Sequence, residues 1–451
     1  MDARVNDEES RHPNISEHGQ QMLASLREHP SAPIYRNQSG HRLLPDEIDR
    51  ARQLEDDAVR ATIDWQPNVP PGWVRPFVEQ CLATSPFYRG YGAMPRSFTE
   101  LPTITREDIA RDMPYLVPDD VDIERLINFR TSGTSGHPLL MASHPLVAAQ
   151  YLGYHKRALR RFGVSLTHGR GQVGVILLGV QSICFTYVSI TPTMDDSGLA
   201  KINLHPNDWR SLDDRAKYLE AMNAEVLAGD PISFATLLDI DPNIRPAALL
   251  STSMTLMPAL RDRLQARFGC PVLDIYSMNE AGPIAVLDAE AGGHVLLQQR
   301  MYVEILDNAD QPVASGQRGE VTLTGGFNFC LPLVRYRTGD HASLERRGDD
   351  LVLVGLEGRP PVKYRRHDGR WLNNIEITHA LRPMPLVQFS VHQDESGHIR
   401  VDYVASSVAK GDVERALRAL LGEETSLEVR QVGSFERKII QYTSALPGAQ
   451  A

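Results

Sequence analysis

Between residues 172 and 290 the chain alternates short apolar runs with amphipathic helical patterns, and this alternation limits the fold more than any other feature. Each apolar run is closed by Gly, Pro or Ser, as buried strands commonly are. The runs are QVGVILL, EVLAGDP, AALLSTSM and PVLDIYS, and the helical patterns are SLDDRAKYLEAM, ISFATLLDI and MPALRDRLQARFG. Strands that alternate with helices predict a parallel sheet with helices on its faces. Because ligands of such sheets bind at the carboxyl ends of the strands, the loops at those ends are the first candidates for a site.

The patterns before and after this stretch predict further units. Residues 1–60 are polar and charged, which predicts an N-terminal helical extension, and residues 61–357 form a predicted large domain. From about 295 to 356 that domain has strand-like patterns, typical of a β-rich subdomain. Residues 358–451 follow the order strand, helix, strand, strand, helix, strand, which predicts a small C-terminal domain. The predicted fold class is therefore α/β: a large N-terminal domain with mainly parallel sheets plus a β-rich subdomain, and a small α+β C-terminal domain.

Length and charge exclude several classes of protein. The chain has 451 residues with 42% hydrophobic content, more than one compact core usually holds. Its net charge is -10 and no dense Lys/Arg stripe occurs, so we expect no nucleic-acid partner. No window approaches the ~20 apolar residues of a membrane span, and the polar N-terminus lacks a secretory core. The four scattered cysteines include no CxxC pair, which suits a reducing compartment. We expect a cytoplasmic protein without a membrane partner.

The strongest local signal is Arg130-Thr-Ser-Gly-Thr-Ser-Gly-His137-Pro138. Small residues let backbone N–H groups turn inward and hydroxyls add donors, a combination that forms a nest for phosphate oxygens. A flexible Ser/Gly linker is the alternative. The loop follows a predicted strand (ERLINF) and precedes a predicted helix (PLVAAQYLGYHKRAL), which favours the phosphate loop. It is not a Walker loop, because the Gly-Lys-Ser/Thr ending is absent.

Three further segments contain candidate ligand-binding residues, although each segment also has an ordinary structural interpretation. At the end of the PVLDIYS run, Tyr276 offers a flat face for a base, and Glu280 offers a carboxylate for Mg²⁺, which usually takes one or two protein carboxylates plus phosphates. In Tyr336-Arg-Thr-Gly-Asp340, the aspartate can meet paired ribose hydroxyls, although Gly-Asp is also ordinary turn chemistry. Lys438 stands near the C-terminus, where a lone lysine is usually solvated.

In order and spacing these segments resemble the acyl-adenylate-forming superfamily, which includes acyl-CoA synthetases, nonribosomal peptide adenylation domains and luciferases. TSGTSGHP resembles its phosphate loop, IYSMNE its Tyr-Gly-x-Thr-Glu segment, and YRTGD its Tyr-x-Thr-Gly-Asp segment. The branch that the chain is most similar to is that of phenylacetate–CoA ligase. Its upstream features, SPFYR and a helix start of the form LP-x-x-hydroxyl-x-x-Asp, match residues 85–89 and 101–108. Independently of the resemblance, Thr105 is a natural N-cap for a short helix, and the apolar spacing from Trp73 to Leu82 predicts another helix.

The resemblance implies ATP and Mg²⁺ as cofactors and gives each matched residue a role. Glu280 would hold Mg²⁺ and Lys438 would steady the carboxylate and α-phosphate, so these two are the candidate catalytic residues. Tyr276 would stack on adenine, with Asn279 beside it, and Asp340 would bind the ribose hydroxyls. Arg359 would sit at the hinge at the start of the C-terminal domain, residues 358–451, which the resemblance implies to be mobile. The residues implied to hold the β- and γ-phosphates are Thr131, Ser132, Gly133, Thr134, Ser135 and Gly136.

The sequence also departs from the family pattern. The hinge Gly358-Arg359 is followed by two prolines, which fix φ near −65° and remove two donors. The glycine-rich turn that approaches the pantetheine tunnel is altered over residues 364–370. Some members of the branch bind zinc through Cys and His; here His294 alone stands at a comparable place, so we predict no zinc and a solvated loop histidine.

The implied reaction is adenylation of a carboxylic acid, followed by transfer to an acceptor such as CoA. The alternatives are transfer to an amine, to another nitrogen nucleophile or to a carrier protein, and a degenerate non-enzymatic module that binds nucleotide or acid. The sequence does not give the oligomeric state, and a homodimer is one alternative. An aromatic or short unsaturated acid would suit the mixed predicted pocket, whose apolar lining residues are Phe185, Tyr187, Phe234, Met254 and Met278.

Overall fold

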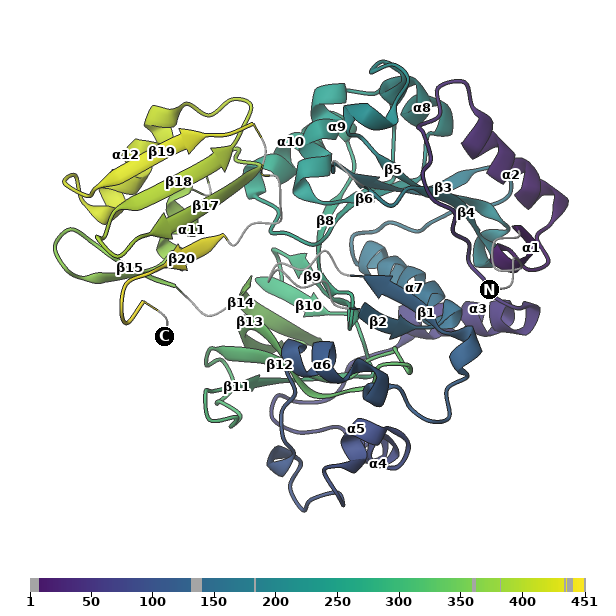
Figure 1. Cartoon of the computed structure of the whole chain (residues 1–451), viewed down its shortest axis with the longest axis horizontal. Helices are drawn as coiled ribbons and strands as arrows, with labels where there is room; N and C mark the ends of the chain where they lie inside the picture. Colours follow the sequence, from purple (N-terminus) through teal and green to yellow (C-terminus); the bar gives the residue numbers. More distant parts are fainter. Residues whose placement is uncertain are drawn as a thin grey trace.

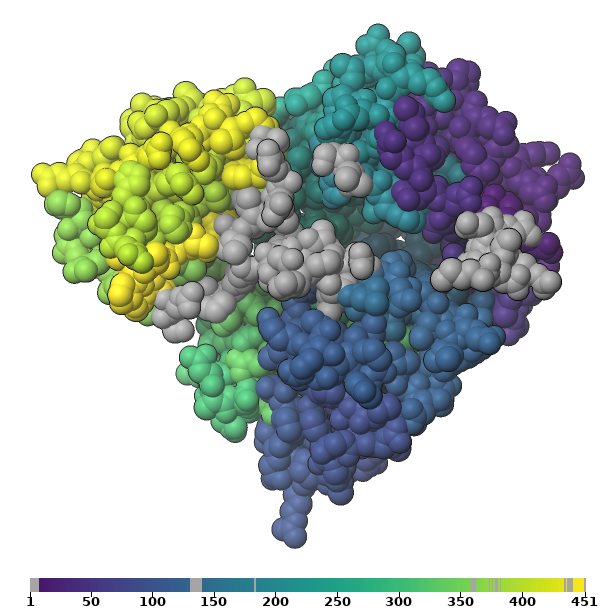
Figure 2. All heavy atoms as spheres, viewed as in Figure 1, coloured from purple at the N-terminus to yellow at the C-terminus, as the bar shows by residue number. Residues whose placement is uncertain are grey.

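The protein forms three lobes, of which the C-terminal one lies to the side (Figures 1 and 2). The structure is a computed structural model. It describes residues 8–130, 140–181, 184–358, 362–381, 383–433, 435 and 441–449. No helix in these ranges is both long enough and apolar enough to span a bilayer.

The four apolar runs of the alternating stretch form neighbouring parallel strands, as predicted. Each pair along the order β5-β3-β6-β7-β8 is parallel, and the added edge strand β4 is antiparallel to β5. The strands are β3 (Val173–Gly179), β4 (Tyr187–Thr191), β5 (Ser197–Asn203), β6 (Val226–Gly229), β7 (Ala248–Ser251) and β8 (Val272–Met278). The predicted helices are α8 (Asp214–Met222), α9 (Pro231–Ile240) and α10 (Pro258–Phe268). Each carries a buried apolar face, which explains why these segments are helical.

The β-rich part does not form a separate sheet but continues the parallel one. Strand β9 pairs antiparallel with β8, and from there the order runs β9-β10-β14-β13-β12-β11 with antiparallel neighbours. Its strands are β9 (Gly282–Asp288), β10 (Gly293–Leu296), β11 (Met301–Leu306), β12 (Gly319–Gly325), β13 (Leu333–Arg347) and β14 (Asp350–Gly358). Residues 276–282 therefore lie where the sheet changes from parallel to antiparallel.

The N-terminal segment 1–60, predicted as a polar extension, packs into the large domain along its described length. Helix α2 (Glu17–Glu28) lies against β4 and β5, and its Met22, Leu23 and Leu26 are buried in the core of the parallel sheet. Helix α3 (Pro45–Arg60) packs on α7 (Pro145–Arg161), where Lys156 pairs with the buried carboxylate of Glu55. Helix α1 (Glu8–Arg11) is a single turn.

Residues 74–143 form a small helical unit and a hairpin. The helices are α4 (Val74–Thr84), α5 (Pro86–Arg89) and α6 (Arg106–Leu116), with short 3-10 turns at Phe98–Glu100 and Ile123–Arg125. Thr105 caps α6 as expected: its hydroxyl accepts the N–H of Asp108, whose carboxylate accepts the N–H of Thr105. Two further 3-10 turns are Pro192–Met194 and Pro206–Asp208.

The hydroxyl-rich loop does not lead directly into a helix. Strand β2 (Leu140–Ser143) intervenes before α7 and pairs antiparallel with β1 (Ile127–Arg130), so the loop joins two strands of a hairpin. The sequence did not signal β2 because four residues are too few to establish a period. Residues 131–139 themselves lie outside the described residues.

The C-terminal unit has the predicted α+β order with an additional hairpin. Its sheet has the order β19-β18-β17-β20, and the hairpin pairs β15 with β16. The elements are β15 (Lys363–Arg365), β16 (Trp371–Asn373), α11 (Asn374–Leu381), β17 (Gln388–Gln393), β18 (Ile399–Val404), α12 (Lys410–Leu421), β19 (Leu427–Gln431) and β20 (Tyr442–Ser444). Met257, at the start of α10, packs into the core of this unit. The boundaries 61, 357 and 358 stay predictions.

His294 is not a solvated loop residue, so that prediction is wrong. It is the second residue of β10, which begins at Gly293. It is half-buried because Leu287 of β9 and Leu353 of β14 flank it in the sheet. In the described residues no three His, Cys, Asp or Glu side chains cluster as metal ligands.

This burial predicts a pH-dependent stability. Burial lowers the pKa of His294 to about 4, whereas an unfolded chain takes up the same proton near 6.5. Between these values the unfolded state binds more protons, so the free energy of unfolding falls as the pH is lowered through that window. We expect His294→Leu to flatten the decline, measured by urea denaturation at pH 7 and pH 5. Equal declines in variant and wild type would contradict it.

Candidate functional site

Three of the predicted site residues meet at the end of β8. Tyr276 lies on β8, Glu280 follows it, and Asp340 lies on β13. The hydroxyl of Tyr276 donates to Oδ2 of Asp340 over 2.7 Å, although the residues are 64 positions apart. The residue implied to stack on adenine therefore touches the one implied to bind the ribose.

Glu280 is buried, with 3% of its surface exposed, and its carboxylate is held from one side. Oε1 accepts the Tyr336 hydroxyl over 2.6 Å and lies 3.4 Å from a guanidinium nitrogen of Arg106. No described residue forms a hydrogen bond with Oε2. A buried carboxylate that the described residues hold through one oxygen fits a Mg²⁺ site, since that ion takes few protein ligands. The residues present thus fit both the metal and the nucleoside of ATP.

Strand β13 aims these side chains because its ladder with β12 is irregular at two points. Register shifts occur between Leu323 and Gly325 of β12 and between Glu320 and Thr322. Opposite the first lies Arg335, with φ at +47°, and opposite the second lies Gly339, with φ at +80°. Bulges re-aim side chains next to functional sites. Here they bracket Tyr336 and Thr338, and the second lies directly before Asp340.

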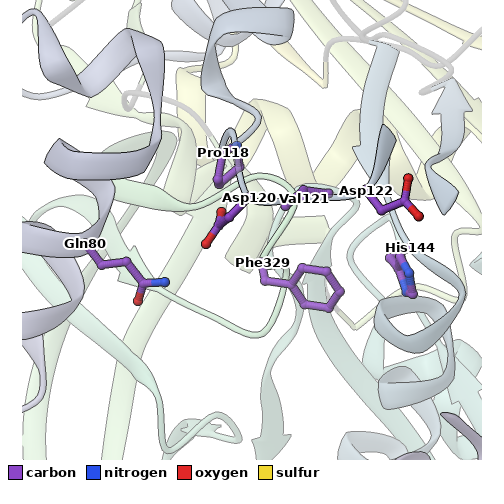
Figure 3. Close-up of a pocket in the computed structure, with 7 residues that line it drawn as sticks. All are labelled: Gln80, Pro118, Asp120, Val121, Asp122, His144 and Phe329. Atoms are coloured by element: carbon purple, nitrogen blue, oxygen red, sulfur yellow. The ribbon is translucent and has the colours of Figure 1, made fainter. Parts of the chain in front are cut away.

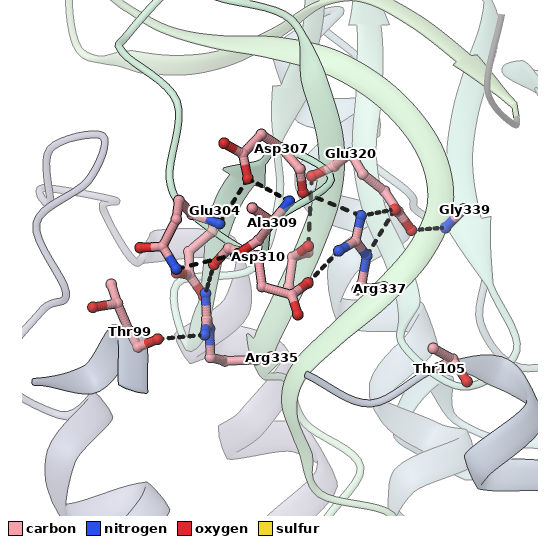
Figure 4. Close-up of polar contacts among 12 residues, drawn as sticks. Thr99, Thr105, Glu304, Asp307, Ala309, Asp310, Glu320, Arg335, Arg337 and Gly339 are labelled. Carbon is pink, nitrogen blue, oxygen red and sulfur yellow. Dashed lines mark hydrogen bonds and ion pairs between the residues drawn. The ribbon is translucent and has the colours of Figure 1, made fainter. Parts of the chain in front are cut away.

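Two arginines hold this irregular strand in place (Figure 4). Arg335 is 1% exposed and donates to the carbonyls of Thr99, Leu101 and Asp310 over 2.7–2.9 Å, with Glu304 beside it at 3.4 Å. Figure 4 shows its side chain directed away from the side where Arg337 meets Glu320. The strand is therefore anchored on one face by a buried cation.

Arg337, which like Arg335 bonds Asp310, anchors the same strand two residues further along. Its guanidinium bonds Glu320 and Asp310, and the second oxygen of Glu320 accepts the Gly339 N–H over 2.9 Å. The Thr338 hydroxyl donates to the Val321 carbonyl over 2.8 Å and accepts the Asp340 N–H over 3.0 Å. These bonds fix the turn that presents the Asp340 carboxylate.

Both tyrosines of the site remain protonated donors. Burial, and then the Asp340 carboxylate, raises the pKa of Tyr276 well above its usual value. Burial, and then the Glu280 carboxylate, does the same to the pKa of Tyr336. The phenol–carboxylate bonds therefore persist over the pH range in which the two acids are ionised.

An aromatic group from α7 lies beside the same loop. The Tyr151 hydroxyl donates to the Asn279 carbonyl over 3.2 Å, and the Tyr151 and Phe327 rings pack edge to face at 5.3 Å. The Phe327 ring covers Gly282, where φ is +71° and a Cβ would fall 2.3 Å from the ring. Glycine is required there for both reasons. Asn279 itself is exposed.

The predicted acid pocket does not form from all five of its predicted residues. Phe234 is fully buried in the core of the parallel sheet, so it has a packing role. Phe185 is 51% exposed and precedes β4, whereas Tyr187 is the first residue of β4, the edge strand five strands from β8. At ~4.8 Å per strand this is roughly 24 Å from the Glu280 loop. The sequence could not reveal this, because strand order is not encoded in local pattern.

Met278 and Met254 are half-buried and closer to the expected place. Met278 follows Tyr276 on β8 and packs against the core that contains Tyr336. Met254 lies in the loop after β7, where its sulfur meets the Gln388 amide of the C-terminal unit at 3.9 Å. Thr131, Ser132, Gly133, Thr134, Ser135, Gly136, Arg359 and Lys438 lie outside the described residues.

Two pockets elsewhere take no part in this arrangement. One of about 200 Å³ is lined by Gln80, Pro118, Asp120, Val121, Asp122, His144 and Phe329 (Figure 3). The other, of about 510 Å³, lies at the opposite, amino end of β3 and β6 and includes His168 and Glu225. Neither is lined by Tyr276, Glu280 or Asp340.

Sequence reasoning missed Arg106, Tyr151, Phe327 and Arg335. Arg106 lies inside the Leu101-to-Asp108 pattern, which predicted the start of a helix but no role for the arginine. Tyr151 and Phe327 reach Asn279 and Gly282 from distant segments. Arg335 precedes the Tyr336-to-Asp340 segment, and only its contacts set it apart from a solvated arginine.

The fold is that of acyl-CoA ligases. The chain superposes on 2-hydroxyisobutyryl-CoA ligase in its postadenylation state, in complex with R3-HIB-AMP, with a TM-score of 0.58 over 88% of both chains at 16% identity. The same enzyme in complex with 2-HIB-AMP gives 0.57. This agreement confirms the predicted α/β fold class. No protein-family model matches the chain.

The sequence is also similar to curated proteins, several of which are CoA ligases. It is 22% identical to protein CapK of Staphylococcus aureus over 306 residues, 63% of this chain and 64% of CapK. It is 25% identical to the phenylacetate-coenzyme A ligase of Pseudomonas putida over 201 residues, and 34% identical to that of Escherichia coli K12 over 114 residues. These cover 40% and 21% of this chain and 45% and 26% of the relatives, so the chain spans less than two thirds of each. The resemblance to the acyl-adenylate-forming superfamily and its phenylacetate–CoA ligase-like branch is thereby confirmed.

Proposed function

We propose that the protein is an adenylate-forming ligase that uses ATP and Mg²⁺ to convert a carboxylic acid into an acyl-AMP, with release of pyrophosphate. The observation that carries this proposal is the buried Glu280 carboxylate, held through one oxygen by Tyr336 beside the Tyr276–Asp340 pair. The relatives, several of which are CoA ligases, support it.

The chain's own side chains have distinct tasks in this reaction. Tyr276 and Asp340 bind and orient the nucleoside, which sets the α-phosphate in place for attack. Glu280 would hold Mg²⁺, and the metal when bound would supply positive charge that offsets the charge of the phosphates. Attack of a carboxylate on a phosphate brings two negative charges together, so Lys438 lowers the barrier by offsetting charge as it develops.

We propose CoA as the acceptor, because CoA ligases recur among the relatives. An amine or a carrier protein is the second candidate, favoured by the altered turn between β15 and β16. That turn closes through the Arg366 N–H and the Arg370 carbonyl at 2.9 Å, and it presents a Trp371 that is 44% exposed. The acid is proposed to be aromatic or short and unsaturated, consistent with Tyr151 and Phe327 beside Asn279.

Exchange of radioactive pyrophosphate into ATP tests the adenylation step directly. A panel of aryl, short unsaturated and long-chain acids should give exchange with at least one aryl or short unsaturated acid and none without acid. Mass measurement of the products formed with CoA, with amines or with a carrier protein then identifies the acceptor. Absence of exchange with every acid, while MgATP still binds, would favour the non-enzymatic module instead.

Lys438→Ala is expected to lower acid-dependent exchange by ~10²–10³, because one electrostatic partner of the developing charge is lost. The dissociation constant of MgATP should change by less than about threefold, since the lysine acts on the reacting groups. Lys410→Ala, on the exposed start of α12, serves as a control within the same unit. Full exchange by Lys438→Ala would remove this lysine from the mechanism.

A further inference from the structure

A guanidinium lies against the candidate metal ligand. Arg106, the first residue of α6, lies 3.4 Å from Oε1 of Glu280, although the two are 174 positions apart. The Arg106 side chain is 29% exposed and that of Glu280 4%. The arginine is thus the more exposed member of this ion pair, and the carboxylate is the buried one.

The surrounding structure builds this contact rather than allowing it by chance. Residue Ile104 forms a parallel bridge with Tyr336, through the Ile104 N–H to the Arg335 carbonyl (3.1 Å) and the Arg337 N–H to the Ile104 carbonyl (2.8 Å). The capping box of Thr105 then begins α6 directly after the bridge. Arg106 is therefore placed by the same strand that carries Tyr336, the other partner of Glu280.

The position is unfavourable for a cation in the helix alone. The N-terminal end of a helix carries partial positive charge and favours acidic side chains, as Glu107 and Asp108 illustrate in the same turn. An arginine at the first position of α6 therefore depends on stabilisation by the acidic groups near its guanidinium, such as Glu280. Its planar fork matches carboxylate and phosphate oxygens alike, which makes it suited to exchange one for the other.

We infer that Arg106 is a phosphate ligand of the nucleotide site. With no nucleotide bound it neutralises Glu280 through Oε1; with MgATP bound it contacts the β- and γ-phosphates and later the departing pyrophosphate, while Glu280 holds the metal through Oε2. The inference rests on the proposed function for the identity of the nucleotide. It assigns to the α4–α6 unit a direct part in binding the triphosphate, beyond the hydroxyl-rich loop.

Calorimetric titration with three ligands tests this role without relying on turnover. For Arg106→Gln we expect MgATP and Mg-pyrophosphate to bind about 10- to 100-fold more weakly, the usual effect of losing a charge-assisted hydrogen bond. AMP, which lacks both phosphates in question, should change by less than about twofold. Arg106→Lys keeps the charge but loses the fork, so an intermediate loss for MgATP is expected. Arg75→Gln, an exposed ion-paired arginine on α4, is the matched control.

Unchanged MgATP affinity in Arg106→Gln would overturn the inference. An equal loss for AMP and MgATP would also overturn it, because the arginine would then only shape the site. If Arg106→Gln does not fold, as judged by circular dichroism, the same three titrations on Arg106→Lys decide between these outcomes. If wild type shows no acid-dependent exchange while Arg106→Gln loses MgATP selectively, the proposed function fails and the phosphate role stands.

Discussion

Glu280→Gln is expected to reduce acid-dependent ATP–pyrophosphate exchange by ~10²–10³ with little loss of fold. The amide has the size of the carboxylate, and its oxygen can still accept the Tyr336 hydroxyl that now lies 2.6 Å away. What it lacks is the negative charge for a divalent cation, so the metal is held poorly and the phosphates keep their mutual repulsion. The measurement is the exchange rate at several Mg²⁺ concentrations, together with thermal unfolding.

A second glutamate provides the control. Glu345 lies on the same strand as Asp340, is 33% exposed and pairs with Arg347. Glu345→Gln should leave exchange within about twofold of wild type, because exposed ion pairs contribute little. If Glu280→Gln keeps more than half of the wild-type exchange, Glu280 is not the metal ligand and the proposed role of this carboxylate in adenylation is wrong.

Arg335→Met should be the most destabilising single change, at about 3–5 kcal/mol. Removing the guanidinium leaves the Glu304 carboxylate, itself 1% exposed, without its cation, and leaves the carbonyls of Thr99 and Leu101 without their buried donor. Urea denaturation followed by tryptophan fluorescence measures the loss. The φ of +47° at this position adds nothing to the loss, since methionine meets the same strain.

The double variant Arg335→Met/Glu304→Met separates the two causes. It should regain part of the loss because no buried charge remains, but not all of it, because the carbonyls stay unpaired. Arg400→Met, 47% exposed, should change stability by less than about 0.5 kcal/mol. A loss below about 1 kcal/mol in Arg335→Met would show that strand β13 does not depend on this anchor.

Local elements followed from the sequence where neighbours in the chain decide them. Apolar spacing from Trp73 to Leu82 predicted a helix that forms at Val74–Thr84, and Thr105 caps α6 as its spacing to Asp108 indicated. The runs that became β3, β6, β7 and β8 were equally clear. Such features depend on contacts within four residues, which a linear pattern records.

Elements decided by distant partners were missed or misplaced. The four residues of β2 are a strand only because β1 lies beside them, and His294 is half-buried only because β9 and β14 flank it. Phe234, Phe185 and Tyr187 are all apolar residues near strand ends, yet Phe234 is in the core, Phe185 is exposed before β4, and Tyr187 begins that edge strand.

The sequence by itself determined the chemical inventory of this protein: a parallel sheet with ligand-bearing loops, and a tyrosine, a glutamate and an aspartate in the order of an adenylate-forming enzyme. Only the tertiary structure decided which side chains contact the Glu280 carboxylate. Tyr336 and Arg106 reach Glu280 across 56 and 174 positions, through a bulged strand and a bridged helix start. The reason is physical: a buried charge is stable only with partners, and burial arises from packing between segments that no local pattern relates.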